Sequence, residues 1–231
     1  MKIAGFQKLT LLDYPGKVAC ILFTNGCNFA CPFCHNSFLV TSDVPVPEYS
    51  EEEIFNFLKK RQGVLDGVCI SGGEPLLHGD LPEFIKKIKE LGYPVKLDTN
   101  GSMPEKLKDV VQSRLVDYVA MDIKNTFDKY PETTGCENIN TDNIKESIDF
   151  LMKGYVDFEF RTTVVKEFHS PQDIEKISEI ISGCDKYYLQ NFVDSGNILG
   201  NNLHPVDENT LREMKLLASK NVKTAQIRGL S

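Results

Sequence analysis

Short apolar runs alternate with amphipathic patterns of helical period along most of the 231 residues of the chain. Strands are predicted at residues 18–23, 67–70, 95–97, 118–123, 158–165, 187–192 and 222–227. Helices are predicted between them, at about 51–62, 81–91, 105–113, 143–152, 171–181 and 207–219. Strands joined by helical crossovers run parallel, and uninterrupted apolar runs are typical of strands covered on both faces. The sequence therefore predicts an α/β fold around a parallel sheet.

This pattern holds about six strand–helix units, whereas a closed (β/α)8 barrel needs eight units and typically about 250 residues. We therefore expect an incomplete (β/α)6 TIM-like barrel of parallel strands that is open on one side. No change of composition marks a linker, so residues 1–231 are predicted to form one domain. Residues 1–17 would lead into it, and residues 18–231 would form the partial barrel.

The composition excludes several classes of protein. Hydrophobic residues make up 41% and charged residues 26% of the chain, as in ordinary globular proteins. A net charge of -7 argues against a nucleic-acid partner, and no apolar run approaches the ~20 residues of a membrane span. Asp13 and Pro15 interrupt any signal-peptide core. The cysteines are not spaced as a disulfide framework, so we expect free thiols in the reducing cytoplasm.

Four polar motifs each follow a predicted strand directly. They are the cysteine-rich loop from Cys27 to Cys34, Ser71-Gly-Gly-Glu-Pro75, Asp98-Thr-Asn-Gly101 and Asp122-Ile-Lys124. The carboxyl ends of parallel strands lie at one face of such folds, and ligands bind there. Motifs that are distant in the sequence are therefore expected to meet at one rim.

Cys27, Cys31 and Cys34 are spaced C-x3-C-x2-C, which provides three thiolates on one short loop. Three thiolates holding a four-iron cluster leave one iron open to another ligand. A zinc site completed by a fourth ligand such as His35 or Cys20 is the alternative, because structural zinc is bound by four ligands. Spacing alone does not decide between the two.

The cysteine motif, with Phe33 before its third cysteine, resembles the signature of the radical S-adenosylmethionine (SAM) enzymes. The resemblance implies a [4Fe–4S] cluster whose open iron chelates SAM, and reductive cleavage of SAM to methionine and a 5′-deoxyadenosyl radical. Gly72-Gly73-Glu74-Pro75 is similar to the GGE motif of that family. Its glycines would lie close to the methionine part of SAM, and Glu74 would accept from the SAM ammonium group.

Two further motifs resemble those of activating enzymes for glycyl radical enzymes. The resemblance implies a monovalent cation bound by Asp98, Thr99, the carbonyl of Met121 and Asp122, with Asn100 near SAM and Lys124 paired with the SAM carboxylate. The competing interpretation is that Asp98 caps the following helix and that Lys124 is solvated. Arg161, on a later strand, could reach the same rim.

Two observations on histidines bear on the expected SAM and cluster sites. Activating enzymes often have a late histidine near the ribose of SAM, and residues 189–192, Leu-Gln-Asn-Phe, contain none. His35 directly follows the third cysteine and is expected beside the cluster rather than on it.

The N-terminal segment FQKLTLLDYPGKVACILFTNGCNFACPFCHN resembles the activating proteins of anaerobic ribonucleoside-triphosphate reductases. That resemblance implies hydrogen abstraction from a glycine of a partner reductase, with flavodoxin or ferredoxin as electron donor. A radical SAM enzyme acting on a small molecule, similar to 7-carboxy-7-deazaguanine synthase, is the alternative. A non-enzymatic zinc or iron–sulfur protein is a third interpretation, and it leaves the other three motifs unexplained.

Overall fold

The computed structural model describes residues 1–40, 47–194 and 196–229 of the chain. One eight-stranded sheet has its strands in the order of the sequence. They are β1 (Ile3–Thr10), β2 (Ala19–Thr24), β3 (Gly67–Gly72), β4 (Val95–Thr99), β5 (Tyr118–Asp122), β6 (Asp157–Val164), β7 (Tyr187–Asn191) and β8 (Ala225–Arg228). From β2 to β8 each strand pairs parallel with the next, which confirms the predicted α/β class.

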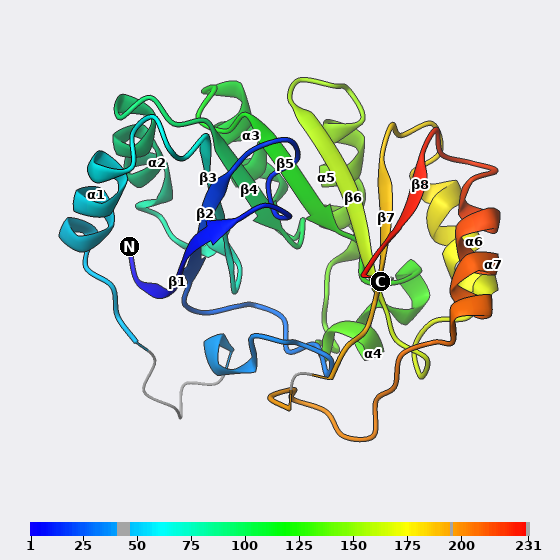
Figure 1. Cartoon of the computed structure of the whole chain (residues 1–231). Helices are drawn as coiled ribbons and strands as arrows, with labels where there is room; N and C mark the ends of the chain where they lie inside the picture. The colour runs from blue at the N-terminus through cyan, green and yellow to red at the C-terminus, as the bar shows by residue number, and fades with distance from the viewer. Residues whose placement is uncertain (41–46, 195, 230–231) are drawn as a thin grey trace.

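Helices connect the parallel strands and lie around the outside of the curved sheet (Figure 1). They are α1 (Glu51–Lys60), α2 (Leu81–Glu90), α3 (Pro104–Gln112), α4 (Tyr130–Thr134), α5 (Thr141–Leu151), α6 (Pro171–Ile180) and α7 (Glu208–Ala218). In the view of Figure 1, α1 and α2 lie on the left, and α6 and α7 lie on the right. Within the described part of the chain, every helix is too short or too polar to span a bilayer.

Local sequence signals explain where several of these helices begin. The Ser50 side chain accepts from the Glu53 N–H at the start of α1, and the Glu53 side chain accepts from the Ser50 N–H. Ser170 and Asp173 form the same reciprocal arrangement at the start of α6. Such capping satisfies N–H groups that have no partner within the helix. The apolar faces of the helices then pack on the sheet, as Phe84, Ile85 and Ile88 of α2 do.

The barrel is open, as predicted, because no hydrogen-bonded ladder joins β1 to β8 among the described residues. The strand β1 was not predicted, since residues 1–17 were expected only to lead into the barrel. It pairs antiparallel with β2, and Gly5, exposed Gln7 and exposed Lys8 interrupt its apolar residues, so it has no apolar run. At the other edge, Arg228 of β8 forms a two-pronged ion pair with buried Glu159 of β6, at 2.8 and 2.9 Å.

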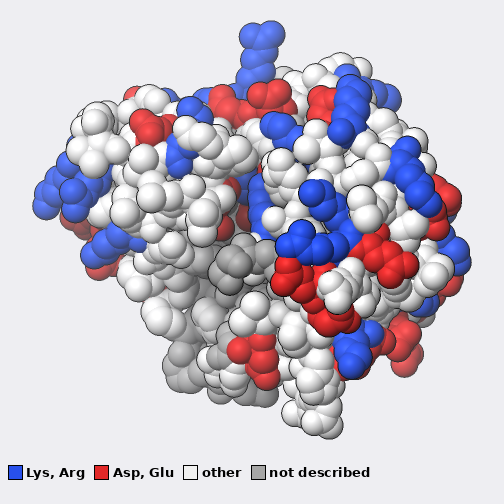
Figure 2. All heavy atoms as spheres, turned by 45° about the vertical axis from the view of Figure 1, so that its right-hand side comes forward, with Lys and Arg blue, Asp and Glu red and all other residues white. Residues whose placement is uncertain are grey.

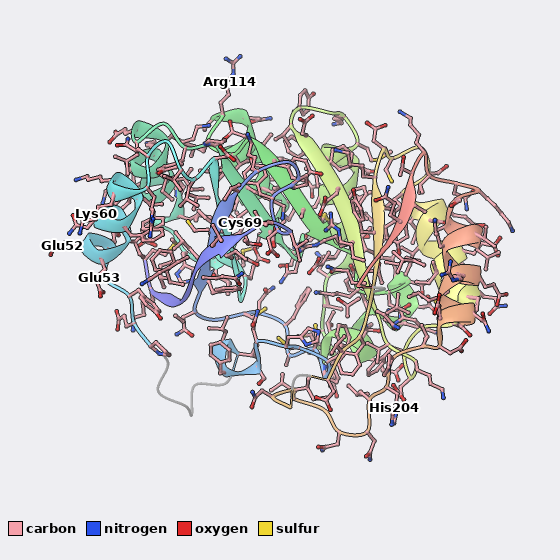
Figure 3. The ribbon with its side chains drawn as sticks, in the orientation of Figure 1. Glu52, Glu53, Lys60, Cys69, Arg114 and His204 are labelled. Atoms are coloured by element: carbon pink, nitrogen blue, oxygen red, sulfur yellow. The ribbon has the colours of Figure 1, made fainter. Side chains whose placement is uncertain are left out.

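Charged side chains also enter the interior of the sheet. Lys96 and Glu159 are fully buried, and Cys69, labelled in Figure 3, lies among the strands. The labelled Glu52, Lys60, Arg114 and His204 lie at the periphery instead (Figure 3). On the face drawn in Figure 2, basic and acidic side chains are intermixed.

Candidate active site

A cavity of about 310 Å³ lies where the parallel strands end. All four polar motifs contribute to its wall, as the parallel topology predicts. The cysteine loop provides Cys27, Cys31, Phe33 and Cys34, and the turn after β3 provides Gly72 and Gly73. The ends of β4, β5 and β6 add Asp98, Thr99, Asn100, Asp122, Lys124 and Arg161.

Backbone hydrogen bonds from several elements hold the cysteine loop. The Gly26 N–H donates to the Leu39 carbonyl at 2.9 Å, and the Ala30 N–H donates to the Thr134 carbonyl of α4 at 2.8 Å. The Phe29 N–H points at the sulfur of Cys27, with a nitrogen–sulfur distance of 3.4 Å. Phe33 is buried against Phe168, with ring centroids 5.9 Å apart. These hydrogen bonds and the buried ring of Phe33 therefore fix the position of the cysteine loop.

The two glycines after β3 allow that turn to lie directly against the cysteine loop. An added Cβ on Gly72 would lie 2.3 Å from the Thr24 nitrogen, and one on Gly73 would lie 1.8 Å from the Gly26 oxygen. Gly72 also has a φ of +118°, which side chains disfavour. Both glycines are thus required because the backbone of this turn packs directly against the backbone of Thr24 and Gly26. The two glycines also line the cavity.

Glu74 lies behind this wall and is fully buried. Its carboxylate accepts from the Leu76 N–H at 3.0 Å, the Thr99 hydroxyl at 2.9 Å and the Asn100 N–H at 2.7 Å. Burial raises the pKa of Glu74 to about 7, although these three donors oppose the rise. Glu74 therefore connects the turn after β3 to the turn after β4, and its predicted contact with SAM stays a prediction.

Asn100 extends the connection to the cysteine loop. Its side-chain amide donates to the Asn28 side chain at 2.9 Å, and the same amide nitrogen lies 4.0 Å from the sulfur of Cys27. Three of the motifs are consequently joined by hydrogen bonds.

Alternating charges run across the ends of β4, β5 and β6. Lys96 pairs with Asp98, Asp98 with Arg161 at 3.2 Å, Arg161 with Asp122 at 2.8 Å, and Asp122 with Lys124 at 3.0 Å. These five residues are the charge row. The helix α3 begins after Met103, so Asp98 does not cap it, contrary to the competing interpretation. Lys124 is also paired rather than solvated.

The model of the radical SAM superfamily matches residues 21–181, a range that holds the cysteine loop and the charge row. The chain belongs to the radical SAM superfamily. Enzymes of this family use a [4Fe–4S] cluster and SAM.

Three curated relatives match between 78% and 99% of the chain. A Methanocaldococcus jannaschii protein, named as a candidate glycyl-radical enzyme activating enzyme, is 36% identical over 236 aligned positions, covering 99% of this chain and 96% of the relative. A 7-carboxy-7-deazaguanine synthase of Geobacter sulfurreducens is 30% identical, covering 82% and 79%. A pyruvate formate-lyase-activating enzyme of Staphylococcus aureus is 28% identical, covering 78% and 74%.

Solved structures share the radical SAM fold at low identity. Streptococcus suis SuiB superposes with a TM-score of 0.70 at 15% identity, over 90% of this chain and 48% of SuiB. This chain thus corresponds to about half of SuiB. A domain of a Bacteroides vulgatus pyruvate-formate lyase-activating enzyme superposes with a TM-score of 0.58 at 19% identity, over 71% of this chain and 99% of that domain.

The three cavity thiols fit the family's cluster. All three cysteines are free and face one cavity, and burial raises the pKa of Cys27 to about 11 and of Cys31 to about 12. Ligation requires deprotonated sulfur, so cluster binding would release protons here. In the part of the chain that the structure describes, no three His, Cys, Asp or Glu side chains converge closely enough for one metal ion. Membership of the radical SAM superfamily favours the [4Fe–4S] cluster over the zinc alternative.

Ion pairing in the charge row favours the charged forms of Asp122 and Lys124. Burial alone would raise the pKa of Asp122, but Arg161 and Lys124 outweigh it and hold this pKa far below its usual range. Burial would lower the pKa of Lys124, but Asp122 and the sulfurs of Cys31 and Cys34 raise it instead. The row holds three cations and two anions, and Lys124 is its end beside the cysteines. An anionic ligand group is favoured there.

The oxygens expected to bind a monovalent cation have partners within the chain. The carboxylates of Asp98 and Asp122 are ion-paired, and the Thr99 hydroxyl donates to Glu74 while accepting from the Gly101 N–H at 3.1 Å. The Met121 side chain is buried beneath Gly101. The Met121 carbonyl as a cation ligand stays a prediction.

The sequence motifs did not identify several residues of the site, among them Asp13, Gln190 and His169. Asp13, from the β1–β2 connection, and Gln190, from β7, both line the cavity. His169 is buried, accepts from the Val165 N–H at 3.1 Å and donates through Nε2 to the Lys124 carbonyl at 2.8 Å. Gln190 belongs to the stretch in which the late histidine is absent. His35, expected beside the cluster, lines the cavity and stacks on Phe192 at 5.6 Å.

Proposed function

We propose that this radical SAM enzyme is an activating enzyme for a glycyl radical enzyme. When bound, the reduced cluster and SAM supply a 5′-deoxyadenosyl radical, which abstracts hydrogen from a backbone glycine of the partner. The partner we propose is an anaerobic ribonucleotide reductase. Flavodoxin or ferredoxin would provide the electron, and the free thiols suit a reducing cytoplasm.

The main support is the match with the candidate activating enzyme of Methanocaldococcus jannaschii, which extends over 99% of this chain. The open barrel adds a physical argument. Hydrogen transfer requires the reacting atoms to lie about 3–3.5 Å apart, so a glycine within a folded partner must enter the site as an extended segment. Among the residues that the structure describes, no ladder joins β1 to β8, which leaves a side of the barrel through which such a segment can approach.

The residues of the chain take distinct parts in this proposal. Cys27, Cys31 and Cys34 hold the cluster, and Lys124 binds the carboxylate of SAM. The turn at Gly72 and Gly73 lies against the methionine part of SAM, with Glu74 as acceptor for its ammonium group. The ends of the neighbouring strands complete the SAM site with Phe33, Asp98, Thr99, Asn100, Asp122 and Arg161.

Electron paramagnetic resonance tests the proposal directly. The reconstituted and reduced protein, mixed with SAM and its cognate anaerobic reductase, should produce a glycine-centred doublet on the reductase. The same mixture with the Cys31→Ala variant should give no doublet. A reductase whose radical-bearing glycine is replaced by alanine should also give none. Absence of the doublet with wild-type proteins, while SAM is still cleaved, would contradict the activating role.

The second candidate is a small-molecule radical SAM enzyme. The 30% identity with the 7-carboxy-7-deazaguanine synthase of Geobacter sulfurreducens favours it. Incubation of the reduced protein and SAM with a purine-like precursor of 7-carboxy-7-deazaguanine distinguishes the two candidates. Turnover of that compound without radical formation on the reductase would support the second.

A further inference from the structure

The guanidinium group of Arg161 bridges two carboxylates from neighbouring strands. Its Nη1 lies 3.2 Å from Oδ2 of Asp98, and its Nε lies 2.8 Å from Oδ1 of Asp122. Arg161 is paired in register with Asp122 across β5 and β6, so the backbone fixes this position. The positive charge therefore lies between the two acids that were expected to bind a monovalent cation.

The remaining carboxylate oxygens are also used. Oδ1 of Asp98 accepts from Lys96, and Oδ2 of Asp98 accepts from the Ser71 hydroxyl at 3.1 Å as well as from Arg161. Oδ2 of Asp122 accepts from Lys124 at 3.0 Å. A hard cation needs several oxygen ligands at once. Because each of these carboxylate oxygens already accepts from a cationic side chain, a bound ion would have to compete with ion pairs that are already made.

The net charge of the charge row also argues against a bound monovalent cation. Within the charge row, Lys96, Arg161 and Lys124 face Asp98 and Asp122, which leaves one positive charge in surplus, and buried Glu159, the other acid that acts on Arg161, is paired with Arg228. A bound cation would double that surplus in a site where the side chains of Arg161 and Asp98 are each only 11% exposed. Like charges repel strongly where water is largely excluded.

We propose that Arg161 serves as the built-in cation of this site, in place of a bound monovalent ion. The chain then binds SAM without requiring K⁺ or Na⁺. Arg161 is a positioning residue, because it holds the Asp98 and Asp122 carboxylates and through Asp122 it orients Lys124. The part that concerns SAM rests on the proposed placement of SAM beside Lys124.

The wild-type protein provides the first test. Equilibrium binding of Tl⁺, a detectable substitute for K⁺, is measured on the reconstituted protein with and without SAM. SAM affinity is measured in potassium, sodium and tetramethylammonium chloride at equal ionic strength. We expect no stoichiometric Tl⁺ binding and less than about threefold variation of SAM affinity among the salts. Stoichiometric Tl⁺ binding, or affinity that depends on K⁺ beyond that range, would overturn the proposal.

Variants of Arg161 provide the second test. Arg161→Gln removes the charge, so SAM affinity in tetramethylammonium chloride should fall roughly tenfold or more and should recover in part when K⁺ or Na⁺ is added. Arg161→Lys should retain most of the affinity without needing the ions. Arg212→Gln, on exposed α7, is the matched control and should behave like wild type. Unchanged affinity of Arg161→Gln in every salt would also overturn the proposal.

The two tests separate this inference from the placement of SAM. The Tl⁺ measurement without SAM depends only on Arg161 and the two carboxylates, and it decides the inference even if Arg161→Gln fails to fold. If Lys124→Ala leaves SAM affinity unchanged, the placement of SAM is wrong, and the Tl⁺ result still stands on its own.

Discussion

The carbonyl oxygen of Gly26 occupies the space that a side chain at Gly73 would need, since an added Cβ would lie 1.8 Å away. The adjacent Glu74 N–H donates to that same oxygen at 2.8 Å. The turn after β3 and the start of the cysteine loop are therefore in direct backbone contact, and neither can move without the other.

Replacing Gly73 by alanine should disrupt this contact. Because the obstructing atom is backbone, we expect Gly73→Ala to destabilise the protein by about 3 kcal/mol and to reduce cluster incorporation. Urea unfolding and the iron content after reconstitution measure the two effects. Gly79→Ala is the control, because its Cβ would meet nothing within 4 Å, and it should change neither quantity. Normal stability and iron content in Gly73→Ala would contradict the packing argument.

Cluster assembly should depend on three cysteines of the seven. Anaerobic reconstitution is expected to give about four irons per chain, and alanine at Cys27, Cys31 or Cys34 should lower this sharply. Cys136 is the strictest control, because its thiol lies 3.2 Å from the Asn28 carbonyl, beside the cysteine loop. Cys136→Ala should keep the full iron content. A need for Cys136 would mean that the cluster has a fourth protein ligand.

Lys124 should contribute to SAM affinity rather than to cluster assembly. The loss of a charge-assisted contact is worth roughly 1.5–3 kcal/mol, so Lys124→Ala should weaken SAM binding about ten- to a hundredfold. Equilibrium dialysis of the reconstituted protein measures this, with iron content checked in parallel. Lys145→Ala, on α5, removes a half-exposed lysine and should have no effect. Equal affinities for the two variants would remove Lys124 from the SAM site.

His169 should make the stability of the protein sensitive to mild acid. Burial lowers the pKa of His169 in the folded state, whereas in the unfolded chain it is about 6.5. As pH falls through about 6.5, the unfolded chain takes up a proton that the folded chain resists. Stability is therefore retained above that pH and lost below it. His169→Gln should flatten this loss in urea unfolding between about pH 5 and 8.

If His169→Gln and wild type lose stability in parallel as the pH falls, buried His169 is not the source of the loss.

The sequence was sufficient to predict the helices and strands whose apolar residues recur with a regular period. The helices predicted at 81–91 and 171–181 correspond to α2 and α6 within one residue. The strand predicted at 95–97 was too short, since β4 continues through Asp98 and Thr99. The apolar pattern stops at Leu97 because Asp98 and Thr99 line the polar cavity. The sequence pattern therefore predicts a loop at the end of the strand that forms the site. Strand β1 and the five-residue helix α4 were missed because neither has a clear apolar pattern.

The motifs predicted which residues line the cavity but not how they interact. That Arg161 bridges Asp98 and Asp122 depends on strand register, which the sequence does not reveal. His169 carries no sequence signal, since its role is a hydrogen bond to the backbone of Lys124, 45 residues away. Such contacts between distant segments form only once the tertiary structure is in place.

The order of the strands in the sheet has a consequence for how the protein is made. Each strand pairs with the one that precedes it in the chain, so the sheet can grow from β1 toward β8 as the ribosome releases each unit. The carboxylates of Asp98 and Asp122 emerge before their shared partner Arg161. We expect them to remain hydrated until β6 docks, so the synthesis of β6 is the step at which the site closes to water.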